Sequence, residues 1–161
     1  PIDDDTETAQ KAAVVLGQVA RIDAAAVRPA LPDLIDALDA ATTGIRANAV
    51  GAVADVAGDL PKAVGEHQDA LAARLDDEAA SVRRNAVATL GRVADADVDL
   101  SESAHTGLVE LLDDPDATVR ATACQALGQV SSPAAAELLR TTADEDEELA
   151  VRKAAERALE N

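Results

Sequence analysis

Arginine and aspartate recur at fixed intervals along the chain, and their types and spacing suit either anion binding or the bridging of neighbouring structural units. The arginine row consists of Arg46, Arg83, Arg120 and Arg152, and the aspartate row, seven residues earlier, consists of Asp39, Asp76 and Asp113. A row of free guanidinium groups could bind an anionic ligand, whereas paired groups could join the turn carboxylates and carbonyls of adjacent units. Because the bidentate geometry of arginine suits such bridging, we favour the structural role for this ladder.

Other residues that could perform chemistry are scarce. The chain has one cysteine, Cys124, two histidines, His67 and His105, and no Phe, Tyr, Trp or Met. Cys124 stands at a position where the other copies of the repeat carry alanine or valine, which predicts a buried, unreactive thiol. A metal site normally needs about three or four ligands, and two scattered histidines do not supply them. We therefore predict no catalytic, cofactor-binding or metal-binding residue.

These residues are carried by a repeated helical unit. Residues 82–93 match residues 119–130 at an offset of 37, and stepping back by the same interval finds copies at 45–56 and 8–19. A last copy begins at Val151, 32 residues after Val119. Within each copy the apolar residues fall at positions 0, 4, 7, 8 and 11, which is the spacing of one face of an α-helix.

A second helical pattern lies between the copies. It is marked by Leu34, Leu71 and Leu108 and, four residues later in each case, by Leu38, Leu75 and Leu112. A short acidic turn follows each pattern, and its side chains can cap the next helix. The sequence therefore predicts one all-α domain over 1–161, with an opening helix at 6–20 and four antiparallel pairs. The pairs cover approximately 23–57, 60–94, 100–130 and 133–160, which gives about nine helices.

Helix–turn–helix units of 37 residues with Leu-x-x-x-Leu, Val/Ile-Arg-x-x-Ala and Ala-Leu-Gly-x-Val motifs resemble HEAT repeats, most closely the short subtype also found in phycobilin lyases. The resemblance implies an α-α superhelix, a solenoid with the first helix of each pair on the convex side and the second on the concave side. Deoxyhypusine hydroxylases of this family carry repeated His-Glu pairs, but here only Glu66-His67 occurs, in reversed order. HEAT-like DNA glycosylases use aromatic residues, which this chain lacks. We expect no enzymatic activity; a HEAT-like lyase or ligand-binding subunit remains an alternative.

The composition is strongly acidic, with 31 acidic and 14 basic residues and a net charge of −17. Aspartate predominates over glutamate, 20 to 11, and there are only three lysines. Such chains resemble proteins of salt-accumulating halophilic archaea, in which salt screens the self-repulsion. No apolar run approaches the about 20 residues of a membrane span, and the acidic start lacks the basic region of a signal peptide. We therefore expect a cytoplasmic protein without a membrane partner.

Charge is distributed unevenly between the two sets of helices. The five inner-helix segments, 8–19, 45–56, 82–93, 119–130 and 151–161, hold nine basic and three acidic residues. Their net charge is +6, which leaves −23 for the rest of the chain. The inner helices are therefore predicted to form a neutral-to-basic, amide-rich trough on an acidic body.

The solvent-facing positions of this trough supply the candidate partner-binding residues. They are Lys11, Asn48, Arg84, Asn85, Arg92, Gln125, Gln129, Lys153 and Arg157. Arg84 and Arg92 are two helical turns apart on one face and are the expected anchors. We predict a non-enzymatic scaffold or adaptor that binds a protein partner, with an acidic segment as the favoured ligand. A nucleic-acid or ribonucleoprotein partner is the less favoured alternative, because the trough has few free bases and no aromatic stacking platform.

Overall fold

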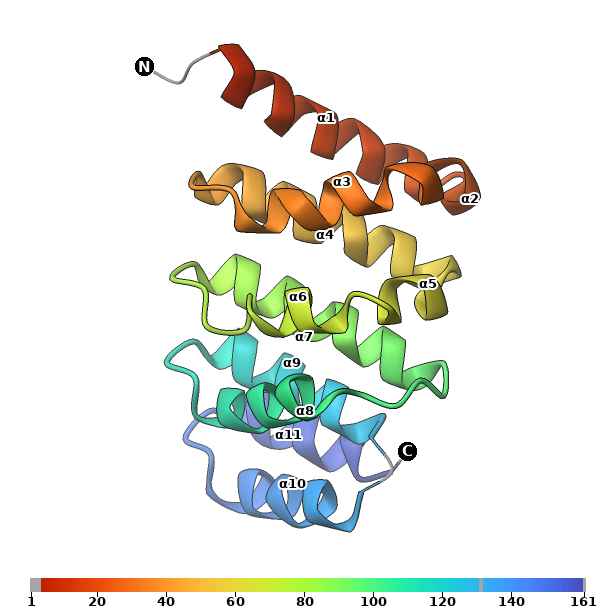
Figure 1. Ribbon diagram of the computed structural model, residues 1–161. Helices are drawn as coiled ribbons and strands as arrows, with labels where there is room; N and C mark the ends of the chain where they lie inside the picture. Colours follow the sequence, from red (N-terminus) through yellow and green to blue (C-terminus); the bar gives the residue numbers. More distant parts are fainter. Residues whose placement is uncertain (1–3, 131, 161) are drawn as a thin grey trace.

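The computed structural model describes residues 4–130 and 132–160, which form two stacked rows of helices (Figure 1). The inner row consists of α1 (Asp4–Ala20), α4 (Thr43–Asp59), α7 (Ala80–Asp95), α9 (Ala117–Gly128) and α11 (Leu149–Ala158). Each inner helix packs directly on the next one in this order. The residues so described contain no strand, and none of their helices is long and apolar enough to cross a membrane.

The outer row covers one side of the inner row. It consists of α2 (Ala24–Val27), α3 (Leu31–Asp36), α5 (Pro61–Gly65), α6 (Gln68–Ala72), α8 (Glu102–Glu110) and α10 (Pro133–Glu145), with 3-10 turns at Arg28–Ala30, Ala37–Asp39 and Leu111–Asp113. An all-α solenoid of paired helices is therefore confirmed as the fold class.

The outer row is more fragmented than the sequence predicted, because the first two pairs do not have a single outer helix each. Pro29 and Pro32 stand at the first or second position of the segments that follow α2. Proline has no amide hydrogen to continue a helix but fits its first turn, so each proline begins a new short segment. In the second pair, the outer helix is interrupted at Glu66 and His67, which separate α5 from α6.

The two rows meet in one continuous apolar core built from alanine, valine and leucine. The outer row contributes the two predicted leucine series, Leu34, Leu71, Leu108 and Leu38, Leu75, Leu112, and all six are buried. The inner row contributes small residues, because its helices lie very close together. An added Cβ at Gly91 would lie 3.2 Å from the Cα of Ala126, and one at Gly128 would lie 2.8 Å from the Cβ of Ala158. Glycine at this repeat position therefore permits the close approach of neighbouring inner helices.

Candidate functional site

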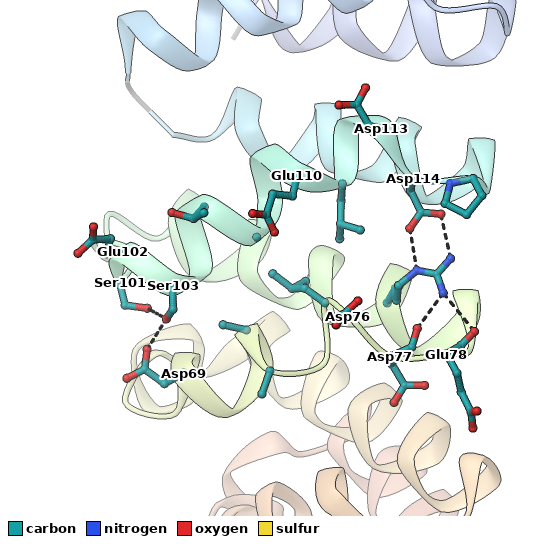
Figure 2. Close-up of a pocket in the computed structure, with 18 residues that line it drawn as sticks. Asp69, Asp76, Asp77, Glu78, Ser101, Glu102, Ser103, Glu110, Asp113 and Asp114 are labelled. Carbon is teal, nitrogen blue, oxygen red and sulfur yellow. Dashed lines mark hydrogen bonds and ion pairs between the residues drawn. The ribbon is translucent and has the colours of Figure 1, made fainter.

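Three of the four ladder arginines, Arg46, Arg83 and Arg120, each join the turn of their own repeat to the turn of the next repeat. Arg83 shows the geometry most clearly, and its partners Asp77, Glu78 and Asp114 are labelled in Figure 2. Its Nε and Nη2 donate to the two carboxylate oxygens of Asp114 at 2.7 and 2.9 Å, and its Nη1 donates to the carbonyl oxygens of Asp77 and Glu78 at 2.8 and 3.2 Å. This bidentate pair clamps two successive repeats together.

The same arrangement recurs along the stack. The Nε of Arg46 donates to Asp77 at 2.7 Å, and the Nε of Arg120 donates to Asp146 at 2.8 Å. We call the pairs Arg46–Asp77, Arg83–Asp114 and Arg120–Asp146 the Arg–Asp ladder. Arg152 donates to the carbonyls of Asp146 and Glu147, at 2.6 and 3.1 Å, within its own turn.

The prediction that Asp39, Asp76 and Asp113 are the carboxylates of this ladder is wrong by one residue. The carboxylates that accept from the ladder arginines are Asp77, Asp114 and Asp146, each one residue after the predicted repeat position. Asp39 instead contacts Arg74 at 3.2 Å, and most of its side chain is exposed. Backbone geometry explains the difference: Asp113 ends a 3-10 turn, whereas Asp114 leaves it in an extended conformation, with φ −60° and ψ 140°. That change of direction buries the side chain of Asp114 and leaves Asp113 exposed.

One signal in the sequence could have identified the correct register. The turn before α4 carries Ala40 at the position of Asp77 and Asp114, and α1 carries Ala9 at the position of the ladder arginines. The two partners are therefore missing together, as expected if the residue at position 40 pairs with the one at position 9. The aspartate row chosen from the sequence shows no such covariation between repeats, because Asp39 is present although Ala9 is not an arginine.

The ladder is a set of structural ion pairs rather than an anion site. Hydrogen bonding to the partner aspartates raises the pKa of Arg46, Arg83 and Arg120 above its usual value. The hydrogen bonds of Arg120 lower the pKa of Asp146. Burial opposes ionisation of Asp77, but its hydrogen bonds with Arg46 and the Ala79 amide outweigh burial and lower its pKa. These guanidinium groups are therefore already neutralised and hydrogen-bonded within the fold.

The candidate partner-binding residues all lie on the inner row, but the structure does not gather them in one place. Lys11, Arg84, Arg92, Gln125, Lys153 and Arg157 are exposed, and Asn48, Asn85 and Gln129 are half-buried. Three of them, Asn48, Asn85 and Arg92, line a hollow of about 450 Å³ whose walls come from α1, α4 and α7. The others lie outside this hollow: Lys11 is on α1, Arg84 is on α7, and the remaining four are on or just after α9 and α11.

Contacts within the hollow fix its basic groups. The Nη1 of Arg92 donates to the carbonyl oxygen of Ala54 at 2.7 Å, which ties α7 to α4. Arg21, just after α1, pairs with Asp55 at 2.5 Å; both residues line the hollow. The sequence analysis missed Arg21, because it lies outside the repeated segment.

Amide side chains are the available polar groups of the inner face. Among the hydrogen bonds found between the described residues, none involves the side-chain amides of Asn48, Asn85, Gln125 or Gln129. Asn48 and Asn85 are 37 residues apart and occupy equivalent positions on neighbouring helices. They therefore present one amide per repeat, each able to donate and accept hydrogen bonds.

A larger hollow lies elsewhere, between the outer elements of the second and third pairs (Figure 2). It has a volume of about 1410 Å³ and is lined by α6, α8 and the turns that follow them. Among the described residues that line it, eight carry carboxylates and one, Arg83, is basic. Asp77 and Asp114 already belong to the ladder, and Asp69 accepts a hydrogen bond from Ser103 at 2.8 Å. The sequence marked the acidic turns but did not show that they border a groove.

The part of the chain that the structure describes brings together no set of groups for metal binding, and its thiol is buried. Within residues 4–130 and 132–160, no three His, Cys, Asp or Glu side chains are placed to hold a metal ion. Cys124 is fully buried, as predicted, and burial raises the pKa of its thiol to about 12. A thiol with such a pKa is not ionised near neutral pH and is a poor nucleophile.

Comparisons with known proteins agree with this architecture. The family model described as HEAT repeats matches residues 68–160. An engineered protein of known structure is 22% identical, with a TM-score of 0.77 over 97% of this chain and 72% of its own. A designed armadillo repeat protein in complex with the peptide (KR)4 is 24% identical, with a TM-score of 0.79 over 98% of this chain and 77% of its own.

The structural matches establish the fold alone, since their sequence identities are low, and the search of curated protein sequences found no match. Helical repeat scaffolds of this kind typically bind proteins and are generally not enzymes. The match to the family model, which spans more than half of the sequence, makes the chain a member of the HEAT-repeat family.

Proposed function

We propose that this protein is a non-enzymatic scaffold or adaptor that binds a protein partner across its inner helices. Solenoids of paired helices are typical protein-binding scaffolds, because their stacked repeats present an extended surface. The designed armadillo repeat protein that shares this fold is in complex with a peptide, which supports an extended polypeptide as one form of ligand.

The observation that carries this proposal is the chemical contrast between the inner face and the rest of the surface. The inner segments have a net charge of +6 and the remaining chain has −23. Arg84 is exposed and makes no ion pair with the described residues. Arg92 is also exposed, and its bond to the Ala54 carbonyl holds the guanidinium in one place. A prepositioned cation binds a carboxylate with less loss of side-chain freedom.

We infer that the partner presents an acidic segment. The peptide (KR)4 of the designed protein is basic, and a basic peptide would be repelled by Arg84 and Arg92. Amides of Asn48 and Asn85 can hydrogen-bond the backbone of an extended segment, while the two arginines select its acidic side chains. The alternative of a nucleic-acid partner has no stacking residue in its favour, and the acidic body would repel phosphates.

The proposal is tested by reversing the two anchor charges. Arg84→Glu with Arg92→Glu should abolish recovery of the partner in affinity capture from a native high-salt lysate, followed by mass spectrometry. The matched control is Lys62→Glu with Arg140→Glu, which makes the same charge change on the outer row. Helicity by circular dichroism should be unchanged in both variants.

Two results would contradict this assignment. If the anchor variant and the control recover every captured protein equally, the inner face is excluded as the binding surface. A low-salt gel shift with bulk RNA that is lost in the anchor variant, without any captured protein, would favour nucleic acid.

The halophilic reading and the cytoplasmic location are proposals of the same kind. The halophilic proposal rests on the net charge of −17 and on the excess of aspartate over lysine. In about 1 M salt the Debye length is near 3 Å, so the repulsion between outer-row carboxylates would be largely screened. Only close contacts, such as those offered by Arg84, would then contribute to recognition.

A further inference from the structure

The outer elements of successive pairs are joined differently along the stack. Between the first and second pairs, Arg74 reaches back to the preceding turn. Its Nη1 donates to the carbonyl oxygen of Leu38 at 2.9 Å, and its Nη2 lies 3.2 Å from Oδ1 of Asp39. Only 20% of the Arg74 side chain is exposed, so its guanidinium group is held between the two outer elements. We call this turn carbonyl and the carboxylate that follows it a guanidinium cradle.

The same cradle is present one repeat later. Leu75 and Asp76 follow Leu38 and Asp39 by 37 residues, which is the repeat interval. The backbone has the same form at both places, since each turn closes with a hydrogen bond of 3.3 Å from an amide to the carbonyl three residues earlier. Both Leu75 and Asp76 line the hollow of about 1410 Å³ between the second and third pairs. A second guanidinium cradle therefore borders this hollow.

Within the described chain, no arginine reaches the second cradle. The residue 37 positions after Arg74 is Leu111, which also lines the hollow. A leucine side chain ends at Cδ, where that of arginine continues into its guanidinium group, and it has no hydrogen-bond donor. Among the hydrogen bonds and ion pairs found between the described residues, none involves the Leu75 carbonyl oxygen or the Asp76 carboxylate. Two acceptors that hold a guanidinium group in one repeat therefore have no donor from the chain in the next.

The charge of the hollow also favours a cation. Asp76, Glu110 and Asp113 line it (Figure 2), are exposed and make no ion pair with another described residue. Its basic residue, Arg83, does not neutralise them, because it already donates to Asp114 and to two turn carbonyls. A cationic ligand in the hollow would therefore meet carboxylates beyond the one in the cradle.

We propose that this hollow binds an arginine side chain of a partner protein, with the guanidinium group held by the Leu75 carbonyl and the Asp76 carboxylate. The bound group takes the position that Arg74 takes in the preceding repeat. Arginine is preferred to lysine, because its planar fork can donate to both acceptors at once, whereas an ammonium group is a point charge. Glu110 and Asp113 favour further basic residues in the same segment. This surface belongs to the outer row and is independent of the inner face proposed above to bind an acidic segment.

Two synthetic peptides, (Gly-Arg)4 and (Gly-Lys)4, test the proposal by isothermal titration calorimetry with the full chain. In about 1 M KCl the Debye length is near 3 Å, so attraction at longer range is screened. We expect the arginine peptide to bind about tenfold more tightly, since the lysine peptide cannot donate to both acceptors of the cradle. Asp76→Asn should weaken binding of the arginine peptide by about tenfold or more. Asp33→Asn is the matched control, because it removes the same charge from an exposed residue of the outer row outside the hollow.

Leu111→Arg tests the equivalence of the two cradles. The longer side chain can reach the second cradle as Arg74 reaches the first, and by occupying it should weaken binding of the arginine peptide by about tenfold or more. Leu138→Arg makes the same change on α10, where Leu138 is 36% exposed, and should leave the affinity nearly unchanged. Circular dichroism checks that each variant is folded, and Asp76→Asn decides the matter if Leu111→Arg is not. Failure of the arginine peptide to bind, equal affinities for the two peptides, or equal effects of a hollow variant and its matched control would overturn the proposal.

Discussion

Replacing Asp114 by alanine should destabilise the protein far more than the same change at the adjacent Asp113. Only about 2% of the Asp114 side chain is exposed, and it accepts three short hydrogen bonds: two from Arg83, at 2.7 and 2.9 Å, and one from the Asp116 amide, at 2.8 Å. Asp113 is exposed. The two changes therefore remove the same group from adjacent residues in very different surroundings.

The magnitude follows from what remains after the change. The Arg83 side chain is 12% exposed, so Asp114→Ala leaves a nearly buried guanidinium without its carboxylate. Breaking one partner of a buried ion pair costs about 3–5 kcal/mol. For a chain of this size, 1 kcal/mol shifts the melting temperature by about 2–4 °C, so we expect a loss of roughly 10 °C. Asp113→Ala should stay within about 0.5 kcal/mol of the parent.

Urea denaturation followed by circular dichroism, in salt that keeps the parent folded, measures both effects. A double-mutant cycle with Arg83→Ala would separate the pair's coupling from the loss of either side chain. Because repeat arrays can unfold in parts, the slopes of the transitions should be compared as well as the midpoints. Equal losses from Asp113→Ala and Asp114→Ala, or a loss below about 1 kcal/mol from the latter, would refute the register of the ladder.

Two further predictions concern packing and acid stability. Gly128→Ala should destabilise the stack, because the added methyl group would lie 2.8 Å from the Cβ and 2.9 Å from the carbonyl oxygen of Ala158. Gly58→Ala has nothing within 4 Å of the added methyl group and should stabilise α4 by up to about 1 kcal/mol. Thermal melts that rank the two variants in the opposite order would contradict this packing. The lowered pKa values of Asp77 and Asp146 mean that their stabilisation is present above the ordinary carboxyl pKa of about 3.9 and is lost as pH falls through the lower folded-state values. Denaturation at pH 5 and pH 3 should therefore show a smaller acid-induced loss for Asp146→Asn than for the parent, and identical losses would argue against this ladder carboxylate.

Periodicity predicted the elements that depend on local spacing. The 37-residue interval identified the inner helices, and the leucine series identified the outer elements, because a helix places residues three and four apart on one face. The same reasoning predicted a buried Cys124, since only the position within the helix was needed. It could not predict where the first outer helix breaks, because Pro29 and Pro32 are compatible with either a kink or a new start.

The candidate site was predictable only in part. The sequence placed Arg84 and Arg92 on the inner row and the charge contrast between the two rows, because both depend on helical phase. It did not show that Arg92 bonds a carbonyl of the neighbouring helix or that Arg21 pairs with Asp55, since these contacts join residues more than 30 positions apart.

By itself, the sequence determined a HEAT-type solenoid, its inner and outer rows, and the arginines of its ladder. Tertiary structure alone decided which of two adjacent aspartates each arginine meets, because that choice depends on the backbone direction where the 3-10 turn ends. It also decided which apolar residues stay open to solvent. Val15 and Val56 both lie in the apolar phase of inner helices, but only the stacking of α1 on α4 buries Val56 and leaves Val15 exposed. Burial depends on the neighbour that a face meets, which the phase of a single helix does not specify.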